Sequence, residues 1–368
     1  MKFIHIADVH LGAVPDSNQA WGVLREKEIW SSFQNIINIC NEEEVDLLLI
    51  AGDLFHKQPL LRELKEANYC FSKLQNTKVV IMAGNHDYIS PRSHYQDFVW
   101  DEKVYMFLSS SMGAVTLPDL NVTVYGLSYG SRDITEPLYD FIRPKDRSGI
   151  NILLAHGGDD KNIPMNRKKM LESGFDYIAL GHIHKPELIH ERMAYCGSLE
   201  PMDRNETGPR GYIKGEIYTD QEARRITLQF IPSSQREYKN ITLEVNQETT
   251  NGSLLDVARE IVRCQGNQHI YSFYIEGIRD EELQFNKEAL KGLGNILEVI
   301  DSSIPDYDFD ALYRENSDNM IGQFIKRIRE HTWANDLGMD NQNRSTTKEE
   351  ITRKALYYGI EALLGAKN

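Results

Sequence analysis

The segment Lys78-Val-Val-Ile-Met-Ala-Gly-Asn-His-Asp87 joins an apolar run to three polar side chains. The β-branched run is typical of a buried strand and is too short for a helix, and Gly84 permits a sharp turn at its end. Asn85, His86 and Asp87 then offer a neutral oxygen, a titratable nitrogen and an anion. Because open α/β sheets bind ligands beyond the carboxyl ends of their strands, this segment predicts a ligand site at a sheet edge.

Four other apolar runs also end in aspartate or histidine, within residues 3–10, 46–56, 150–157 and 177–184. One such ending is most often an ordinary turn, but five in succession favour a shared site. In Gly181-His-Ile-His184, the period of two places both imidazoles on one face of an extended segment. If the runs are strands of one sheet assembly, their ends form a rim. The candidate metal ligands on this rim are Asp8, His10, Asp53, Asn85, His156, His182 and His184.

This set of two carboxylates, one amide and four imidazoles suits a pair of divalent ions. The absence of thiolates argues against a structural zinc site, and the abundance of imidazole argues against a pure magnesium or calcium site. Manganese, iron and zinc remain, with Asp53 as a ligand that can bridge both ions. Two ions about 3.5–4 Å apart can hold a hydroxide between them and clamp a phosphoryl displacement.

Charge and cysteine content restrict the class of protein. The 368 residues carry 41 basic and 55 acidic side chains, a formal charge of −14, which argues against nucleic-acid binding through a generally basic surface. The four cysteines are widely spaced without a Cys-x-x-Cys pair, as expected for reduced thiols in the cytoplasm. We expect no signal peptide and no membrane span, because residues 1–7 already have the pattern of a strand and no apolar run reaches about 20 residues.

Alternating apolar runs and amphipathic segments predict an α/β fold. We expect a catalytic domain over residues 1–235, a small α+β capping domain over 236–303, and an acidic link with a helical tail over 304–368. In the tail, Ile321, Phe324, Ile325 and Ile328 form one apolar stripe. A last helix over about 347–364 carries a second stripe. These stripes fit either docking on a partner or packing within the chain.

The order Asp-x-His, Gly-Asp, Gly-Asn-His-Asp, His and Gly-His-x-His resembles the calcineurin-like metallophosphoesterase superfamily over about residues 1–200. Asp8-Val-His-Leu-Gly12, Gly52-Asp-Leu-Phe-His56 and Cys196-Gly-Ser-Leu-Glu200 are similar to the SbcD-type DNA repair exonuclease branch. The resemblance implies a four-layer α/β/β/α sandwich. Residues 238–300 match the capping domain of that branch only in position, size and pattern.

Carried over by position, the resemblance also implies roles for the rim residues. One ion is held by Asp8, His10, Asp53 and His184, and the other by Asp53, Asn85, His156 and His182. His86 acts on the substrate phosphate and protonates the leaving oxygen. Asp87 orients the His86 ring and favours its protonated form, and His56 is a second imidazole on the substrate side.

The implied activity is two-metal phosphodiester hydrolysis of DNA by an exonuclease subunit that also has endonuclease activity. The implied metal is manganese, and the implied partners are DNA, a second copy of the chain and an SbcC-type coiled-coil ATPase. Hydrolysis of cyclic nucleotides or other small phosphodiesters is an alternative, although a small substrate needs no added domains. A non-catalytic scaffold is a third interpretation, but such members usually lose ligands, and here every ligand position is filled.

Basic side chains in three clusters are candidates for contact with DNA phosphates, although such clusters are often only solvated surface. They are Arg143, Lys145, Arg147, Arg167, Lys168, Lys169, Arg204 and Arg210.

Overall fold

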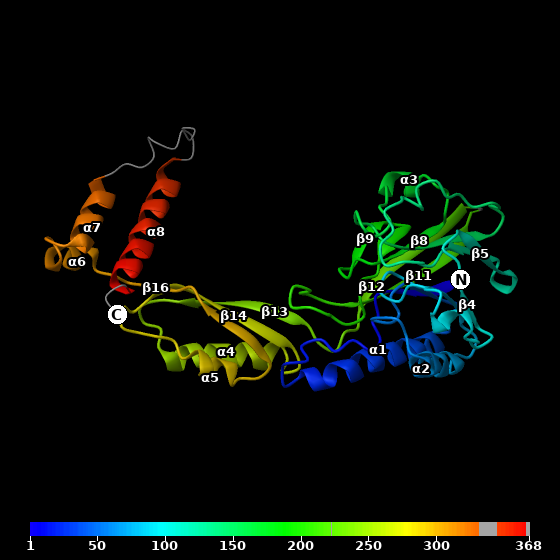
Figure 1. The fold of residues 1–368 in the computed structure, drawn as a ribbon, viewed down its shortest axis with the longest axis horizontal. Helices are drawn as coiled ribbons and strands as arrows, with labels where there is room; N and C mark the ends of the chain where they lie inside the picture. The colour runs from blue at the N-terminus through cyan, green and yellow to red at the C-terminus, as the bar shows by residue number, and fades with distance from the viewer. Residues whose placement is uncertain (222, 331–343, 366–368) are drawn as a thin grey trace. The chain divides into compact units, whose positions relative to one another are not determined.

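Figure 1 shows a computed structural model of the chain, which describes residues 1–221, 223–330 and 344–365. The described residues form two compact units. The first contains residues 1–239 with 268–270, and the second contains the remaining described residues. The predicted three-part division at residues 235 and 303 stays a prediction. Residues 331–343 and 366–368 of the predicted tail lie outside the described residues.

The first sheet of the first unit is largely parallel and has the strand order β12-β11-β1-β2-β3-β4. Its strands β1 to β4 pair in parallel, and β11 joins β1 in antiparallel orientation. The central strand β2 is buried along its whole length, as expected for a parallel sheet covered on both faces. The strands are β1 (Lys2–Ile6), β2 (Leu47–Ala51), β3 (Lys78–Met82), β4 (Val104–Met106), β11 (Gly211–Asp220) and β12 (Ala223–Pro232).

Helices α1 (Gly22–Glu42) and α2 (Leu61–Ser72) cover one face of this sheet (Figure 1). The side chains of Ile29, Phe33 and Ile36 recur at helical spacing and are buried. They pack with residues of β1, β2 and β3 in one apolar cluster. The opposite face of the sheet is therefore left for a second sheet.

The second sheet has the strand order β5-β6-β7-β8-β10-β9, with β6, β7, β8 and β10 parallel. An apolar core containing Phe3, Leu49, Val124 and Ile152 lies between the two sheets. The short helix α3 (Arg167–Leu171) belongs to the cluster on the outer face of the second sheet. The strands are β5 (Gly113–Leu117), β6 (Val122–Gly126), β7 (Ile150–His156), β8 (Tyr177–Gly181), β9 (Glu187–His190) and β10 (Met193–Tyr195).

The four-layer α/β/β/α sandwich is confirmed. The five apolar runs that precede the predicted ligands correspond to β1, β2, β3, β7 and β8, because burial on both faces makes their sequences continuously apolar. The short strands β4, β5 and β9 were not predicted, since few of their side chains are buried and their sequences carry little apolar pattern.

The second unit contains a sheet of β13 (Tyr238–Val245), β14 (Ile270–Arg279), β15 (Ile296–Asp301) and β16 (Ile304–Pro305). Helices α4 (Asn251–Gln265) and α5 (Lys287–Lys291) supply the rest of its apolar core. The predicted acidic link contains an additional helix, α6 (Phe309–Glu315), whose Asp308 side chain caps its first turn. The link is therefore partly helical, which its acidic composition did not reveal.

Helices α7 (Met320–Glu330) and α8 (Arg344–Gly365) pack their predicted apolar stripes against each other. Ile321, Ile325 and Ile328 of α7 are buried with Leu356 and Ile360 of α8. Of the two interpretations of the stripes, packing within the chain is what the structure shows.

A buried ion network fixes α1 to the segments that follow β10 and β12. Arg25 is fully buried and donates to Glu28 at 2.8 Å and to the Pro201 carbonyl at 2.6 Å. Its guanidinium lies 3.6 Å from the buried carboxylate of Glu200. Glu28 also pairs with Arg236 at 2.7 Å. Each charge in this network is compensated by a partner, which is what permits its burial.

Replacing Arg25 by methionine is expected to destabilise the first unit by about 3–5 kcal/mol, because the buried Glu200 carboxylate loses the cation 3.6 Å from it in a dry site. Denaturant unfolding followed by tryptophan fluorescence measures the loss, since Trp21 and Trp30 lie beside and on α1. Arg167→Met is the matched control. Its exposed pair with Glu187 should contribute no more than about 1 kcal/mol. Equal losses in both variants would show that the buried network does not stabilise the fold.

Candidate metal centre

The two sheets bring five strand ends to one rim. Asp8 and His10 follow β1, Asp53 follows β2, and Asn85 follows β3 in the first sheet. In the second sheet, His156 ends β7, and His182 with His184 follows β8. All seven predicted ligand positions therefore lie at or just beyond the carboxyl ends of parallel strands, where ligands bind in open α/β sheets.

The backbone at this rim is held in an uncommon conformation. Asp8, His10 and Asp53 have φ of 51°, 53° and 51°, and His182 has φ of 95°. The left-handed region is sparsely populated by residues other than glycine, and such residues concentrate at functional sites. Four of the seven predicted ligands thus have strained backbones, which indicates that their positions are set by more than chain connectivity.

Hydrogen bonds between the loops hold the strained residues in place. The Asp8 N–H donates to the Gly52 carbonyl and the His10 N–H to the Asp53 carbonyl, both at 3.1 Å. The His182 N–H donates to the Asp8 carboxylate at 2.9 Å, which connects the two sheets. The rim is therefore preorganised by its own backbone.

One group of donor atoms consists of Asp8, His10 and His184. The Nε2 atoms of His10 and His184 are 3.0 Å apart, and His184 Nε2 lies 3.9 Å from the Asp8 carboxylate. Asp8 and His10 are buried, whereas His184 is partly exposed. This half of the centre therefore opens to solvent on the side of His184.

The second group consists of Asp53, Asn85, His156 and His182. The Asn85 Oδ1 atom lies 2.9 Å from His156 Nε2 and 3.2 Å from His182 Nδ1. His156 Nε2 is also 3.4 Å from the Asp53 carboxylate. The other ring nitrogen of His156, Nδ1, donates to the Ala51 carbonyl at 2.8 Å, so Nε2 is the nitrogen that faces the group.

Burial and charge oppose each other at these groups. Burial alone raises the pKa of Asp53, but the imidazoles of His156, His10 and His86 lower it overall. Burial lowers the pKa of His156, but the carboxylates of Asp53 and Asp8 raise it overall. Burial raises the pKa of Asp8 despite the nearby histidines. The pKa of each of these groups is therefore set by the balance between its burial and the opposite charges beside it.

The donor set fits divalent metal ions. Neighbouring ligands at about 2.0–2.2 Å from one ion lie about 3 Å apart, which is the spacing of His10 and His184 and of Asn85 and His156. Oxygen and imidazole ligands without thiolate suit an ion of intermediate hardness.

Two glycines permit the close approach of the strand ends. A Cβ atom on Gly84 would lie 2.2 Å from the Asp53 Oδ1 atom. A Cβ atom on Gly181 would lie 1.9 Å from the Ala51 carbonyl oxygen. Any side chain at either position would push the strand ends apart, so glycine is required here for packing.

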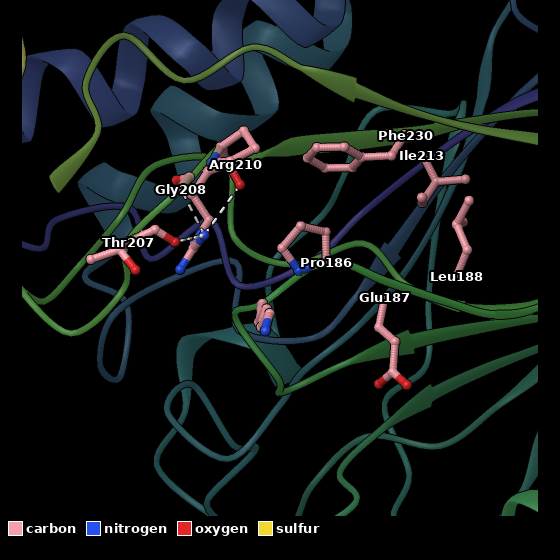
Figure 2. A pocket seen from close by; sticks show the side chains of 10 residues that line it. Pro186, Glu187, Leu188, Thr207, Gly208, Arg210, Ile213 and Phe230 are labelled. Atoms are coloured by element: carbon pink, nitrogen blue, oxygen red, sulfur yellow. Dashed lines mark hydrogen bonds between the residues drawn. The ribbon is translucent and has the colours of Figure 1, made fainter. Parts of the chain in front are cut away.

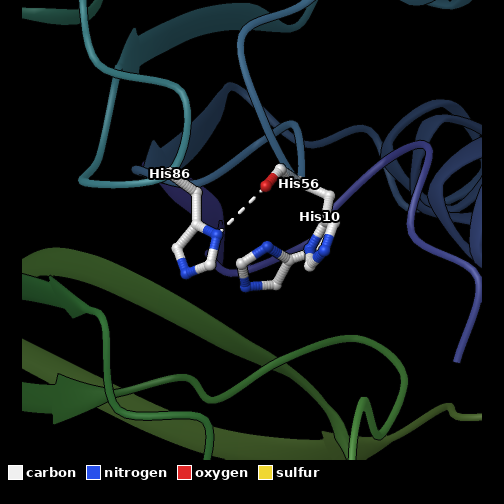
Figure 3. Close-up of side chains that lie close together, drawn as sticks. All are labelled: His10, His56 and His86. Carbon is white, nitrogen blue, oxygen red and sulfur yellow. Dashed lines mark hydrogen bonds between the residues drawn. The ribbon is translucent and has the colours of Figure 1, made fainter. Parts of the chain in front are cut away.

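His86 and His56 lie beside His10 at the open side of the centre (Figure 3). His86 Nδ1 donates to the His56 carbonyl at 3.0 Å (Figure 3). The main-chain N–H of His86 donates to Asp53 Oδ1 at 2.9 Å. The first bond orients the His86 ring so that Nε2 is the nitrogen not bonded to the His56 carbonyl, and the second holds its main chain. The His56 side chain reaches solvent, but partial desolvation of its ring, together with the nearby His86 imidazole, lowers the pKa of His56.

Asp87 does not orient the His86 ring, contrary to the prediction. Its buried carboxylate accepts from the Gly84 N–H at 2.8 Å, the Phe55 N–H at 3.2 Å and the Tyr95 hydroxyl at 2.8 Å. The side chain therefore points into the protein and closes the loop that carries Asn85 and His86. Burial and the charge of Asp53 raise its pKa. The ring is oriented instead by a main-chain carbonyl, which a sequence pattern does not reveal.

A model of the calcineurin-like phosphoesterase family matches residues 1–186 of the 368-residue chain. This part supplies all five strands that carry the rim and all seven candidate ligands. The chain belongs to this family.

Relatives of this phosphoesterase include bacterial and archaeal proteins. The uncharacterized metallophosphoesterase YhaO of Bacillus subtilis is 28% identical over 273 residues, which cover 66% of this chain and 65% of YhaO. The DNA double-strand break repair protein Mre11 of Methanocaldococcus jannaschii is 33% identical, with 56% and 58% covered. Mre11 of Saccharolobus solfataricus is 25% identical, with 79% of both chains covered. The match thus spans less than two thirds of the first two relatives.

Two carboxylates of the phosphoesterase that the sequence did not indicate contact predicted ligands. Glu206 lies 2.6 Å from His184 Nδ1, and Asp159 lies 2.7 Å from His182 Nε2. Both belong to polar loops whose composition predicts turns. Their proximity to the rim depends on the tertiary fold and has no signal in the local sequence.

The basic candidates for DNA contact are not equally accessible. Arg210 is 3% exposed, and its guanidinium donates to the carbonyls of Thr207, Gly208 and Pro209 (Figure 2). The prediction that Arg210 contacts DNA is therefore wrong, because its guanidinium is buried and hydrogen-bonded to the carbonyls of its own loop. This loop lines a cleft of about 360 Å³ with residues 185–188, Ile213 and Phe230 (Figure 2).

Other basic candidates lie at the surface, some with acidic partners. Arg167 pairs with Glu187 at 2.8 Å, and Lys169 lies 3.3 Å from Asp140. Arg143, Lys145, Arg147, Lys168 and Arg204 are also exposed. Among the described residues, no helix is both long enough and apolar enough to cross a membrane.

Proposed function

We propose that this phosphoesterase is a two-metal phosphodiesterase that hydrolyses DNA, as the nuclease subunit of an SbcD-type repair complex. The observation that carries the proposal is the meeting of seven ligand-type side chains with two further imidazoles, His56 and His86, on one solvent-accessible rim. The Mre11 relatives support DNA as the substrate.

In this proposal, Asp8, His10 and His184 hold one ion, and Asn85, His156 and His182 hold the other. Asp53 is shared between them. When bound, the ions supply Lewis acidity toward the phosphoryl oxygens and an acidified water at the site. We propose manganese as the metal, on the basis of the mixed oxygen and imidazole donors.

His86 acts on the substrate side of the centre. Because its Nδ1 proton is held by the His56 carbonyl, the ring offers Nε2 to the phosphate. In its protonated form, His86 donates from Nε2 to the leaving 3′ oxygen and balances the negative charge that develops on phosphorus. His56, whose pKa is lowered, contributes a neutral hydrogen-bond donor beside it. Asp87 supports both by holding the loop and is a positioning residue.

The surface and the second unit supply candidate binding functions. We propose that Arg143, Lys145, Arg147, Lys168 and Arg204 contact DNA phosphates, with smaller contributions from the paired Arg167 and Lys169. Because α7 and α8 cover each other's apolar stripes, a coiled-coil ATPase partner would contact their other faces. Met320, Ile351 and Tyr358 are exposed there. The proposed complex is cytoplasmic and contains two copies of the chain.

The proposal is tested with metal-depleted protein before and after addition of Mn²⁺. Hydrolysis of linear duplex DNA and hydrolysis of a cyclic nucleotide are measured under both conditions. We expect manganese-dependent degradation of DNA, including internal nicking, and little hydrolysis of the cyclic nucleotide. If the protein hydrolyses the cyclic nucleotide but not DNA, the proposed substrate changes from DNA to a small phosphodiester. Failure to bind manganese would make the chain a scaffold with this fold.

A further inference from the structure

Glu206 is bonded to a predicted ligand without belonging to the predicted ligand set. Its Oε1 atom lies 2.6 Å from His184 Nδ1, while His184 Nε2 faces His10. Its other oxygen, Oε2, accepts the Met202 N–H at 3.0 Å and lies 3.8 Å from the Arg210 guanidinium. The carboxylate is therefore fixed by its own loop and presents one oxygen to the ring.

Asp159 repeats this arrangement at the other half of the centre. Its Oδ2 atom lies 2.7 Å from His182 Nε2, while His182 Nδ1 faces Asn85. Its Oδ1 atom accepts the N–H groups of Lys161 and Asn162, both at 2.8 Å. The two carboxylates come from different loops and contact opposite ring nitrogens, Nδ1 in His184 and Nε2 in His182.

We propose that Glu206 and Asp159 are positioning residues that determine which ring nitrogen of His184 and His182 faces the metal centre. A carboxylate can only accept a hydrogen bond, so the ring nitrogen beside it must carry the proton. Glu206 therefore keeps the proton of His184 on Nδ1 and leaves the Nε2 lone pair for an ion. Asp159 keeps the proton of His182 on Nε2 and leaves the Nδ1 lone pair. Each carboxylate thereby sets the affinity of one half of the centre. The inference rests on the proposed metal centre.

The two effects should differ in size. The side chain of Glu206 is 17% exposed and that of Asp159 is 48% exposed. Water can replace an exposed hydrogen-bond partner more readily than a buried one. Loss of an outer partner of a ligating histidine typically weakens metal binding by about 10- to 100-fold. We expect Glu206→Ala near the upper end of that range and Asp159→Ala near the lower end.

Calorimetric titration of the metal-depleted full chain with Mn²⁺ tests the proposal. Wild type should bind two ions. Glu206→Ala should weaken binding of one ion, and Asp159→Ala should weaken binding of the other. Glu206→Gln should weaken binding less than Glu206→Ala, because its amide oxygen still accepts the Nδ1 proton although its NH₂ group then faces the Met202 N–H. Glu187→Ala and Asp160→Ala are matched controls, because each removes an exposed carboxylate next to the same loops. Both controls should leave the two affinities unchanged.

The positioning role would be overturned if both alanine variants bind Mn²⁺ with wild-type affinity. It would also be overturned if one variant weakens binding of both ions equally. If a variant fails to fold, long-range ¹⁵N–¹H NMR of histidine-labelled wild type at alkaline pH gives the answer. The proposal requires Nδ1–H in His184 and Nε2–H in His182, and the opposite tautomers would contradict it. Absence of manganese binding in wild type would instead refute the proposed metal centre.

Discussion

Asp53→Asn is expected to remove tight binding of at least one metal ion and to lower the rate of DNA hydrolysis by about 10³-fold. The loss follows from several kcal/mol of charge stabilisation at the reacting phosphate, at about 1.4 kcal/mol for each factor of ten. Asp53 is 1% exposed, and its carboxylate lies between His156 and the His86 N–H. Asparagine keeps the shape and tolerates the left-handed backbone, so the change removes mainly the negative charge.

Calorimetry with Mn²⁺ and single-turnover cleavage of linear duplex DNA measure the two losses. Asp160→Asn, a change of the same type at an exposed position, is the control and should match wild type. Thermal unfolding of the metal-free variant checks that the fold is kept. Retention of both ions and of cleavage by Asp53→Asn would show that this carboxylate is not shared between metals.

His86→Gln is expected to lower the rate of DNA cleavage by about 10²–10⁴-fold while leaving manganese affinity unchanged. Glutamine retains the main-chain N–H that donates to Asp53, but it cannot give a proton to the leaving oxygen. Cleavage of a DNA substrate with a good leaving group at the scissile bond should be affected much less, because such a group needs no proton. Comparing the two substrates isolates the proton-transfer role.

The control for this prediction is metal stoichiometry. His10, His56 and His86 lie close enough together to share an ion. If His86→Gln lowers the number of bound manganese ions, His86 is a ligand and the assignment of His86 to the substrate phosphate is wrong. If His86→Gln binds the normal number of manganese ions and cleaves both DNA substrates more slowly by the same factor, the His86 side chain has a role in binding but not in proton transfer.

The rim could be predicted from the sequence because one rule governs it. Apolar runs buried on both faces identify parallel strands, and the residues directly after such strands share one edge. This placed Asp8, Asp53 and His156 together although they lie far apart in the chain. The ends of β1, β2, β3, β7 and β8 therefore needed no information beyond the order of the runs.

The contacts of the side chains could not be predicted in this way. Asp87 follows His86 directly, yet its carboxylate turns inward to Tyr95 and the His86 ring bonds to a main-chain carbonyl. Glu206 and Asp159 reach the centre through loops whose composition predicts only turns. Arg210 resembles a surface cation in sequence but is buried by its own loop. In each case the partner is chosen by tertiary packing, which a local pattern does not contain.

The most direct test returns Mn²⁺ stepwise to the metal-depleted chain. Electron paramagnetic resonance measures free manganese, and cleavage of linear duplex DNA is followed in the same samples. We expect little cleavage while one ion is bound per chain and a steep rise as the second ion binds. Full cleavage with one ion bound, or none with two, would contradict a two-metal nuclease at this rim.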